Sequence, residues 1–201
     1  MSDLFTEPDG GTPLDAADQE ELIPTWLATR AELNEAEQEN IAEAQLWAVG
    51  RSWSIAEFDQ GWLKALHKRM FYKVWRWAGR YRTADTNLGV PWPQIQTATE
   101  TLLLDLREQT SDVDHLPWLA EELAVRFHHR LVKIHPFPNG NGRHARLAAD
   151  LVIGALDGPR FGWGAGAPLA DTGPARAEYL DALREADSTG NYTPLLVFAK
   201  R

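Results

Sequence analysis

The sequence from 135 to 146 reads His135-Pro136-Phe137-Pro138-Asn139-Gly140-Asn141-Gly142-Arg143-His144-Ala145-Arg146, and it separates two helical patterns. The residues before it are apolar at every fourth position, as on one buried helix face: Leu119, Leu123, Phe127 and Leu131. Proline cannot continue that helix, and glycine can adopt the positive φ angles of a tight turn. The segment therefore predicts a helix, a turn and the N-terminus of a second helix.

This arrangement suits an anion, because a helix N-terminus exposes N–H groups and carries partial positive charge. Arg143 and Arg146 are close together on the first turns of the second helix, and two guanidinium groups beside such N–H groups suit a polyphosphate. His135 stands at the loop's entry, where an imidazole can act as a base. The alternative is an ordinary helix–helix loop with arginines in surface ion pairs. The joint occurrence of these residues favours the anion site.

Composition narrows the class of protein. A chain of 201 residues with 44% hydrophobic and 24% charged residues fits one globular domain with a short N-terminal extension. The formal charge of -9 disfavours a nucleic-acid surface, and no apolar run approaches the roughly 20 residues of a membrane span. There is no cysteine and no signal-peptide pattern, so we expect a cytoplasmic protein without a membrane or direct nucleic-acid partner.

Most of the chain shows helical patterns. Asn34 with Glu37, and Ser54 with Glu57, look like capping boxes that open two helices. Further helices are expected at about 93–110, 117–134, after the motif, at 174–186 and at 191–199, with a glycine-rich loop at 160–173. Residues 81–92 lack a helical period and predict a short hairpin or extended flap around Asn87. The expected fold is all-α with one flap.

The segment from 135 to 146 resembles the signature of the Fic family, His-x-Phe-x-(Asp/Glu)-Gly-Asn-Gly-Arg-x-x-Arg, and only Asn139 departs from it. A weaker likeness at 77–82 and 179–198 extends the resemblance to roughly residues 52–201. Residues 1–51 are then an N-terminal arm and helix, for which a regulatory role is a hypothesis. The segment 29–38 resembles a bacterial subgroup named mobile mystery protein B, whose members also carry Asn at that position. Many are encoded beside a small helix-turn-helix protein, which is thus an expected partner. The resemblance implies a helical bundle with a β-hairpin flap over the active site.

The resemblance also implies an activity: transfer of AMP from ATP onto a Ser, Thr or Tyr hydroxyl of a target protein. His135 would be the general base and Phe137 the buried anchor of the loop. The N–H groups of Gly140, Asn141 and Gly142 would cradle the α- and β-phosphates, with an added contact from the Asn141 side chain. Arg143 would bind the β-phosphate and Arg146 the γ-phosphate.

Two further features follow from the resemblance. The flap, at Thr86, Asn87, Leu88 and Gly89, would hold the target by adding a strand to it, although an ordinary surface hairpin is the alternative. The acidic residue that the family has at Asn139 helps hold Mg²⁺. Asn offers a carbonyl oxygen without charge, so we expect weaker metal binding and slower chemistry.

Many members of the family are inhibited by their own glutamate, which pairs with the second motif arginine, here Arg146. The usual pattern is (Ser/Thr)-x-x-x-Glu-(Gly/Asn), and two frames come near it, with Glu32 and Glu39 as the acids. The alternative for both is a solvated acidic helix face.

Three functions remain open on the sequence: an AMP transferase, a related transferase of another group such as phosphoryl, and a non-catalytic nucleotide-binding module, which Asn139 would favour. A metal hydrolase is disfavoured because no His-Glu-x-x-His or comparable ligand spacing occurs. A homodimer stays open, and the sequence does not name the target protein.

Overall fold

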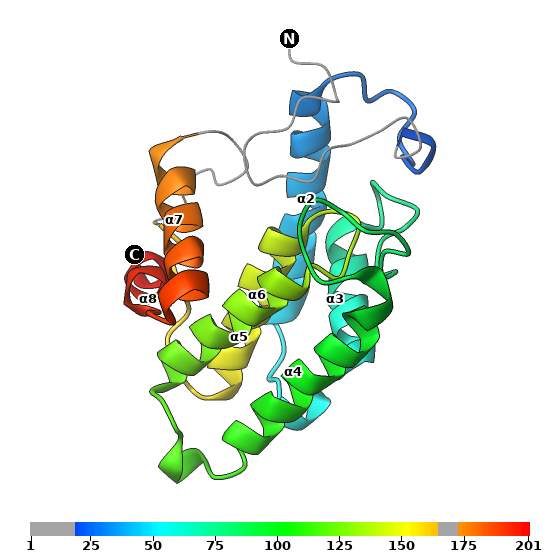
Figure 1. The fold of residues 1–201 in the computed structure, drawn as a ribbon. Coiled ribbons are helices and arrows are strands. Elements are labelled where there is room, and N and C mark those ends of the chain that lie inside the picture. Colours follow the sequence, from blue (N-terminus) through cyan, green and yellow to red (C-terminus); the bar gives the residue numbers. More distant parts are fainter. Residues whose placement is uncertain (1–18, 165–172) are drawn as a thin grey trace.

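The computed structural model describes residues 19–164 and 173–201, and the regular secondary structure in these ranges is helical (Figure 1). The helices are α2 (Arg30–Val49), α3 (Gln60–Phe71), α4 (Ile95–Gln109), α5 (Ala120–Ile134), α6 (Asn141–Ala155), α7 (Pro174–Thr189) and α8 (Thr193–Lys200). Single 3-10 turns lie at Ile55–Glu57, Trp92–Gln94 and Val113–His115. The expected all-α fold is confirmed.

The bundle is built around the two helices that flank the motif. α5 and α6 form the most extensive helix pair, and α3 packs against both α2 and α6. Of the four-residue repeat before the motif, Leu123, Phe127 and Leu131 are at most 3% exposed. Leu119 is 74% exposed because it lies just before the first residue of α5, so its place in the buried stripe was wrongly predicted.

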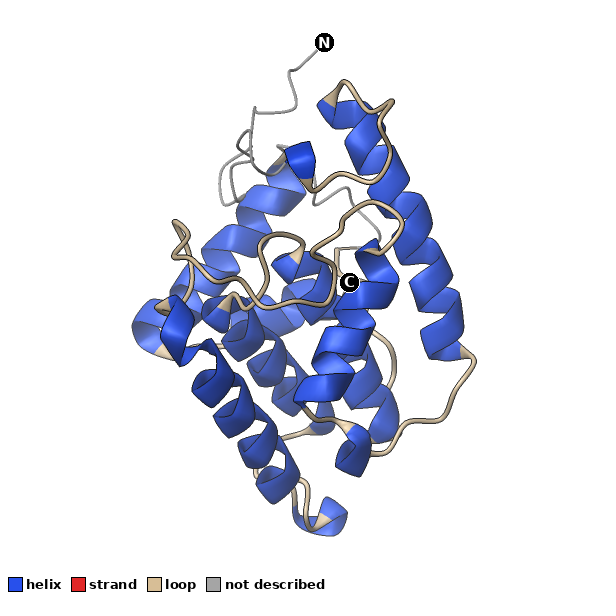
Figure 2. Ribbon diagram, turned by 90° about the vertical axis from the view of Figure 1, so that its right-hand side faces the viewer, coloured by secondary structure: helices blue, strands red, loops and turns tan. Residues whose placement is uncertain are grey.

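Residues 80–91 form a flap of turns and bends, and Figure 2 shows no strand in the described parts of the chain. The predicted β-hairpin is therefore not found. A physical reason is that the flap's backbone bonds the motif segment instead of itself: the Arg82 N–H donates to the Pro136 carbonyl at 3.0 Å, and the Val90 N–H donates to the Ile134 carbonyl at 3.3 Å.

The N-terminus of α2 differs from the prediction. Thr29 is the N-cap, and its hydroxyl accepts the Glu32 N–H while Glu32 accepts the Thr29 N–H at 2.9 Å. Helix α2 thus begins one turn earlier than the Asn34–Glu37 pair suggested, and Glu37 faces the interior at 2% exposure. The Ser54–Glu57 box is confirmed, but it opens a 3-10 turn, and Asp59 caps α3.

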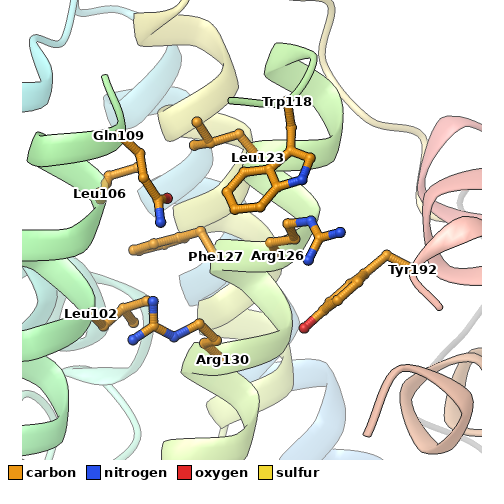
Figure 3. A pocket seen from close by; sticks show the side chains of 9 residues that line it. All are labelled: Leu102, Leu106, Gln109, Trp118, Leu123, Arg126, Phe127, Arg130 and Tyr192. Carbon is orange, nitrogen blue, oxygen red and sulfur yellow. The ribbon is translucent and has the colours of Figure 1, made fainter. Parts of the chain in front are cut away.

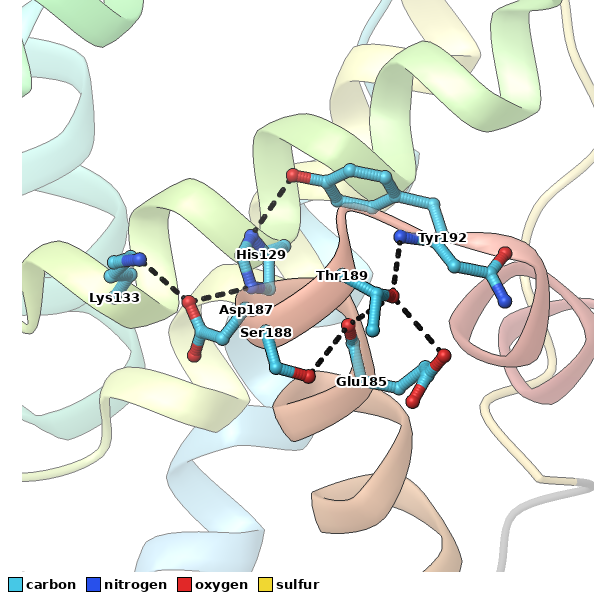
Figure 4. A network of polar contacts seen from close by, with 8 residues as sticks. His129, Lys133, Glu185, Asp187, Ser188, Thr189 and Tyr192 are labelled. Atoms are coloured by element: carbon cyan, nitrogen blue, oxygen red, sulfur yellow. Dashed lines mark hydrogen bonds and ion pairs between the residues drawn. The ribbon is translucent and has the colours of Figure 1, made fainter.

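The C-terminal helices are fastened to α5 by a polar network (Figure 4). Asp187 accepts from Lys133 at 2.7 Å and pairs with His129 at 3.3 Å. The Tyr192 hydroxyl lies 3.4 Å from the other ring nitrogen of His129. This network holds α7 and the start of α8 against the helix that leads into the motif.

Within residues 19–164 and 173–201, no helix is both long and apolar enough to cross a bilayer. Most of the glycine-rich loop predicted at 160–173, and the first 18 residues of the arm and helix predicted at 1–51, lie outside the described residues.

Candidate functional site

Two backbone reversals shape the motif loop. His135 ends α5 with φ 54° and ψ 60°, a left-handed conformation that non-glycine residues rarely adopt. Gly140 takes φ 76° at the N-cap of α6, and a Cβ there would lie 2.4 Å from Cζ of Phe71. Glycine is thus required at 140 by both conformation and space. At Gly142 the nearest atom to such a Cβ is 3.6 Å away, so no comparable restriction applies.

The loop is closed by Asn141. Its side-chain oxygen accepts the Phe137 N–H at 2.9 Å, and its amide donates to the Phe137 carbonyl at 2.8 Å. Both ends of the amide thus bond Phe137 and hold the loop together. The expected contact of this side chain with a phosphate stays a prediction. The backbone N–H of Asn141 remains part of the helix N-terminus. Phe137 is fully buried, as an anchor should be.

His67 on α3 supports the loop from below, although the sequence did not single it out. Its ring stacks on Phe137 at 3.7 Å, its Nδ1 accepts the Gly79 N–H at 3.0 Å, and its Nε2 lies 3.1 Å from the Asn139 carbonyl. Because Nδ1 accepts, Nε2 carries the proton and donates to Asn139. Burial lowers the pKa of His67 well below 6.5, which keeps this neutral tautomer at physiological pH.

Arg143 is held by a buried acid. Its guanidinium donates to one oxygen of Glu37 at 2.6 Å, and the other oxygen accepts the Trp75 indole N–H at 2.6 Å. The Glu37 side chain is 2% exposed and that of Arg143 is 21% exposed. The acid-rich segment of α2 thus reaches the motif, but through a residue and an arginine other than those predicted.

The two predicted inhibitory acids lie elsewhere. Glu32 accepts the N–H groups of Ala28 and Thr29 at the start of α2, and Glu39 is exposed on the same helix. Among the described contacts neither acid is bonded to a motif arginine. The pattern that suggested them fixes spacing along the helix, whereas burial decides which face meets α6. Glu37 has the inward position.

Arg146 has an aromatic neighbour. Its guanidinium carbon lies 5.4 Å from the centre of the Tyr179 ring on α7, and the Tyr179 hydroxyl is hydrogen-bonded to His128 at 3.0 Å. Burial lowers the pKa of Arg146, and a hydrogen bond with the Tyr179 hydroxyl opposes that shift. Asp150, one turn further along α6, has its pKa raised by burial to about 6. The structure thus provides Arg146 with a phenol, whereas the sequence predicted a glutamate partner.

His135 is buried, with only 7% of its surface exposed to solvent. Burial lowers the pKa of its imidazole to about 4, while a hydrogen bond with the Val132 backbone acts in the opposite direction. One ring nitrogen bonded to that carbonyl leaves the other to accept a proton. The imidazole is therefore neutral at pH 7, the state that a general base needs.

The flap lies directly over His135. A Cβ on Gly89 would come within 2.6 Å of the His135 Cβ, so the flap backbone packs against the Cβ that carries the imidazole ring. Asn87, Leu88 and Gly89 are exposed, and the Thr86 hydroxyl donates to the Leu88 carbonyl at 2.6 Å. The predicted docking residues and the predicted base are thus brought together.

Asn139 provides a poor metal ligand. Its side-chain oxygen accepts the Gly140 N–H at 2.6 Å, and the group carries no charge. Among the residues described, no group of three His, Asp or Glu side chains could hold a metal ion. The neutral Asn139, whose oxygen already accepts a hydrogen bond, does not supply the charged oxygen ligand that suits Mg²⁺.

A separate pocket opens between α4 and α5, away from the motif in sequence (Figure 3). Arg126 lies there between two aromatic rings, 4.4 Å from the centre of Trp118 and 4.1 Å from that of Tyr192, and it pairs with Glu122 at 2.7 Å. None of the residues that line this pocket belongs to the motif. The candidate site therefore remains the loop, the two motif arginines, His135 and the flap.

Comparison with known proteins finds a family match over the part of the chain that contains this site. Residues 57–153 match the model of the Fic/DOC family. The chain is 31% identical over 102 residues to the protein adenylyltransferase VbhT of Bartonella schoenbuchensis, covering 49% of this chain and 21% of that protein. It is 30% identical over 124 residues to the protein adenylyltransferase fic-1 of Caenorhabditis elegans, covering 62% and 23%. The chain thus spans less than a quarter of the length of these relatives.

The fold is also shared with solved structures of Fic proteins. The crystal structure of the BepC effector protein from Bartonella tribocorum, with bound AMPPNP, superposes with a TM-score of 0.66 at 18% identity, covering 96% of this chain and 93% of that one. Residues 57–153, which include the motif loop, His135 and the flap, thus match the Fic/DOC family, and the fold is shared with solved Fic proteins.

Proposed function

We propose that this protein is a Fic-type adenylyltransferase that moves AMP from ATP onto a hydroxyl of a protein. The observation that carries the proposal is that a buried neutral imidazole, a helix N-terminus and the two arginines of its first turns all belong to one motif. The relatives named protein adenylyltransferases, and the bound AMPPNP of one structural neighbour, support the same substrate and reaction.

In the proposed reaction, the neutral His135 takes the proton of the attacking hydroxyl. The hydroxyl oxygen forms a bond to the α-phosphorus, and the bond from that phosphorus to the bridging oxygen breaks, so that pyrophosphate leaves. Arg143, Arg146 and the N–H groups at the start of α6 hold the phosphates and offset the charge that builds on the leaving group. The exposed backbone of the flap, at Asn87 and Leu88, aligns the target segment.

Two alternatives are distinguished by the label transferred. The protein is incubated with ATP labelled at the α- or the γ-phosphate, and its own chain and lysate proteins are examined for label. We expect transfer of the α label. Transfer of the γ label would instead indicate a phosphoryl transferase, and ATP binding without transfer would indicate a nucleotide-binding module, which the neutral Asn139 favours.

We also propose that Glu37 restrains this activity. Its carboxylate occupies Arg143 at 2.6 Å, and a phosphate oxygen that needs the same guanidinium must compete with it. The second contact of Glu37, with the Trp75 indole, holds the carboxylate in this position. A segment outside the family match, α2, would thus control access to the motif.

A further inference from the structure

Arg82 is buried, with a side chain only 3% exposed, and its guanidinium donates to three backbone carbonyls. Nε donates to His135 at 2.7 Å and one terminal nitrogen donates to Ala84 at 2.9 Å. The other terminal nitrogen donates to Val90. One planar group therefore joins the motif residue His135 to both sides of the flap, and no other side chain type offers donors in such a fork.

The position that Arg82 bonds is a strained one. His135 has positive φ, which is unfavourable for a residue other than glycine and persists only where its surroundings impose it. The Arg82 contact fixes the peptide that follows this residue, because the bond falls on the carbonyl of His135 itself. The orientation of the imidazole then depends on Arg82 and on the flap above it.

The charge of Arg82 has little compensation. The nearest acid, Asp85, is 3.7 Å away and its side chain is 68% exposed. Burying a cation on carbonyl oxygens alone is unfavourable compared with an apolar side chain of similar size. A positive charge close to His135 does have an effect there, since it disfavours the protonated imidazole.

We propose that Arg82 is a positioning residue, which aims the His135 imidazole and couples it to the flap that holds the target. The proposal rests on the proposed function of His135 as the base. Arg82 touches neither nucleotide nor target in this scheme, and acts through the backbone of His135, Ala84 and Val90.

The test compares Arg82→Lys and Arg82→Gln with Arg80→Gln. Arg80 lies two residues earlier, and its side chain is 64% exposed, so the control removes the same charge from the surface. Lysine at position 82 keeps the charge but cannot reach three separate carbonyls. Because it retains the charge, Arg82→Lys is the variant that we expect to fold more readily than Arg82→Gln. The readouts are the melting temperature, the ATP dissociation constant, kcat for transfer of the α label, and the ring signals and pKa of His135 by NMR, assigned with His135→Ala.

We expect both Arg82 variants to lower kcat by about 10- to 100-fold, the effect of a misplaced reacting group, while ATP affinity changes by less than about threefold. The His135 ring signals should move in both variants, and in Arg82→Gln the pKa of His135 should rise. His135 signals that match those of Arg80→Gln would overturn the proposal. So would a parallel loss of ATP affinity, kcat and melting temperature. If the wild-type protein transfers nothing, the proposed function fails, but the ring signals still decide whether Arg82 positions His135.

Discussion

Replacing Glu37 with glutamine should make the protein less stable and better able to bind ATP. The carboxylate and guanidinium are 2.6 Å apart and the acid is 2% exposed. Two unit charges at about 4 Å and an effective dielectric constant near 20 attract by about 4 kcal/mol, of which desolvation offsets a part. Glutamine keeps the size and can still accept the Trp75 N–H, so we expect a net loss of about 2 kcal/mol in unfolding free energy, or a melting temperature about 4–8 °C lower.

The free energy of the Glu37–Arg143 interaction should also affect the binding of ATP. If ATP must displace Glu37 from Arg143, removing the acid should tighten ATP binding by up to about 30-fold, the equivalent of 2 kcal/mol. The assays are thermal unfolding and calorimetric titration with ATP. Glu39→Gln is the matched control, because it removes an exposed negative charge from the same helix. Lower stability with unchanged or weaker ATP binding would refute the reasoning, since Glu37 would then support Arg143 for the nucleotide.

Other changes test the loop. Asn139→Asp should raise the transfer rate and its dependence on Mg²⁺, because it adds a charged oxygen ligand; an unchanged rate in a folded variant would contradict this. Gly140→Ala should cost about 3 kcal/mol or more in unfolding free energy, given its positive φ and a Cβ 2.4 Å from Phe71, whereas Gly142→Ala should cost less than about 1 kcal/mol; equal costs would contradict the assigned geometry. Stability should fall as pH falls from 7.5 to 5.5, since buried histidines with lowered pKa values bind protons only when unfolded. Each contributes about 1.3 kcal/mol over this range. The raised pKa of Asp150 offsets about 1 kcal/mol, so the net loss is at least about 3 kcal/mol, and a constant melting temperature would contradict it. The histidines counted are His128, His135 and His144, and the lowered pKa values of His67 and His129 act in the same direction.

Much of the helical framework could be predicted from the sequence, because its signals are local. Apolar spacing identified α5, and proline and glycine marked the break before α6. The same local signals placed His135, Arg143 and Arg146 around one helix N-terminus. Capping was less certain, since Thr29 and Asn34 both offer a side chain for an N-cap, and tertiary packing decides between them.

The partners of the site were not predictable in the same way. The bond between Glu37 and Arg143 joins residues far apart in sequence, and the face of α2 that meets α6 is settled by burial. His67 and Arg82 act on backbone carbonyls, which leave no trace in the sequence. A buried histidine within an apolar stripe was the available signal for His67. For Arg82 the available signal was its place within the predicted flap at 81–92.

The most direct test of the central claim is the rate of α-label transfer after changing His135. Glu37→Gln provides the background, so that ATP has free access to Arg143, and His115→Ala provides the control because that histidine is 82% exposed. His135→Ala should lower the rate by about 10²- to 10⁴-fold, the usual contribution of a general base, with ATP affinity unchanged. A rate within tenfold of the His115→Ala control would contradict the claim that His135 is the base of an adenylyl transfer.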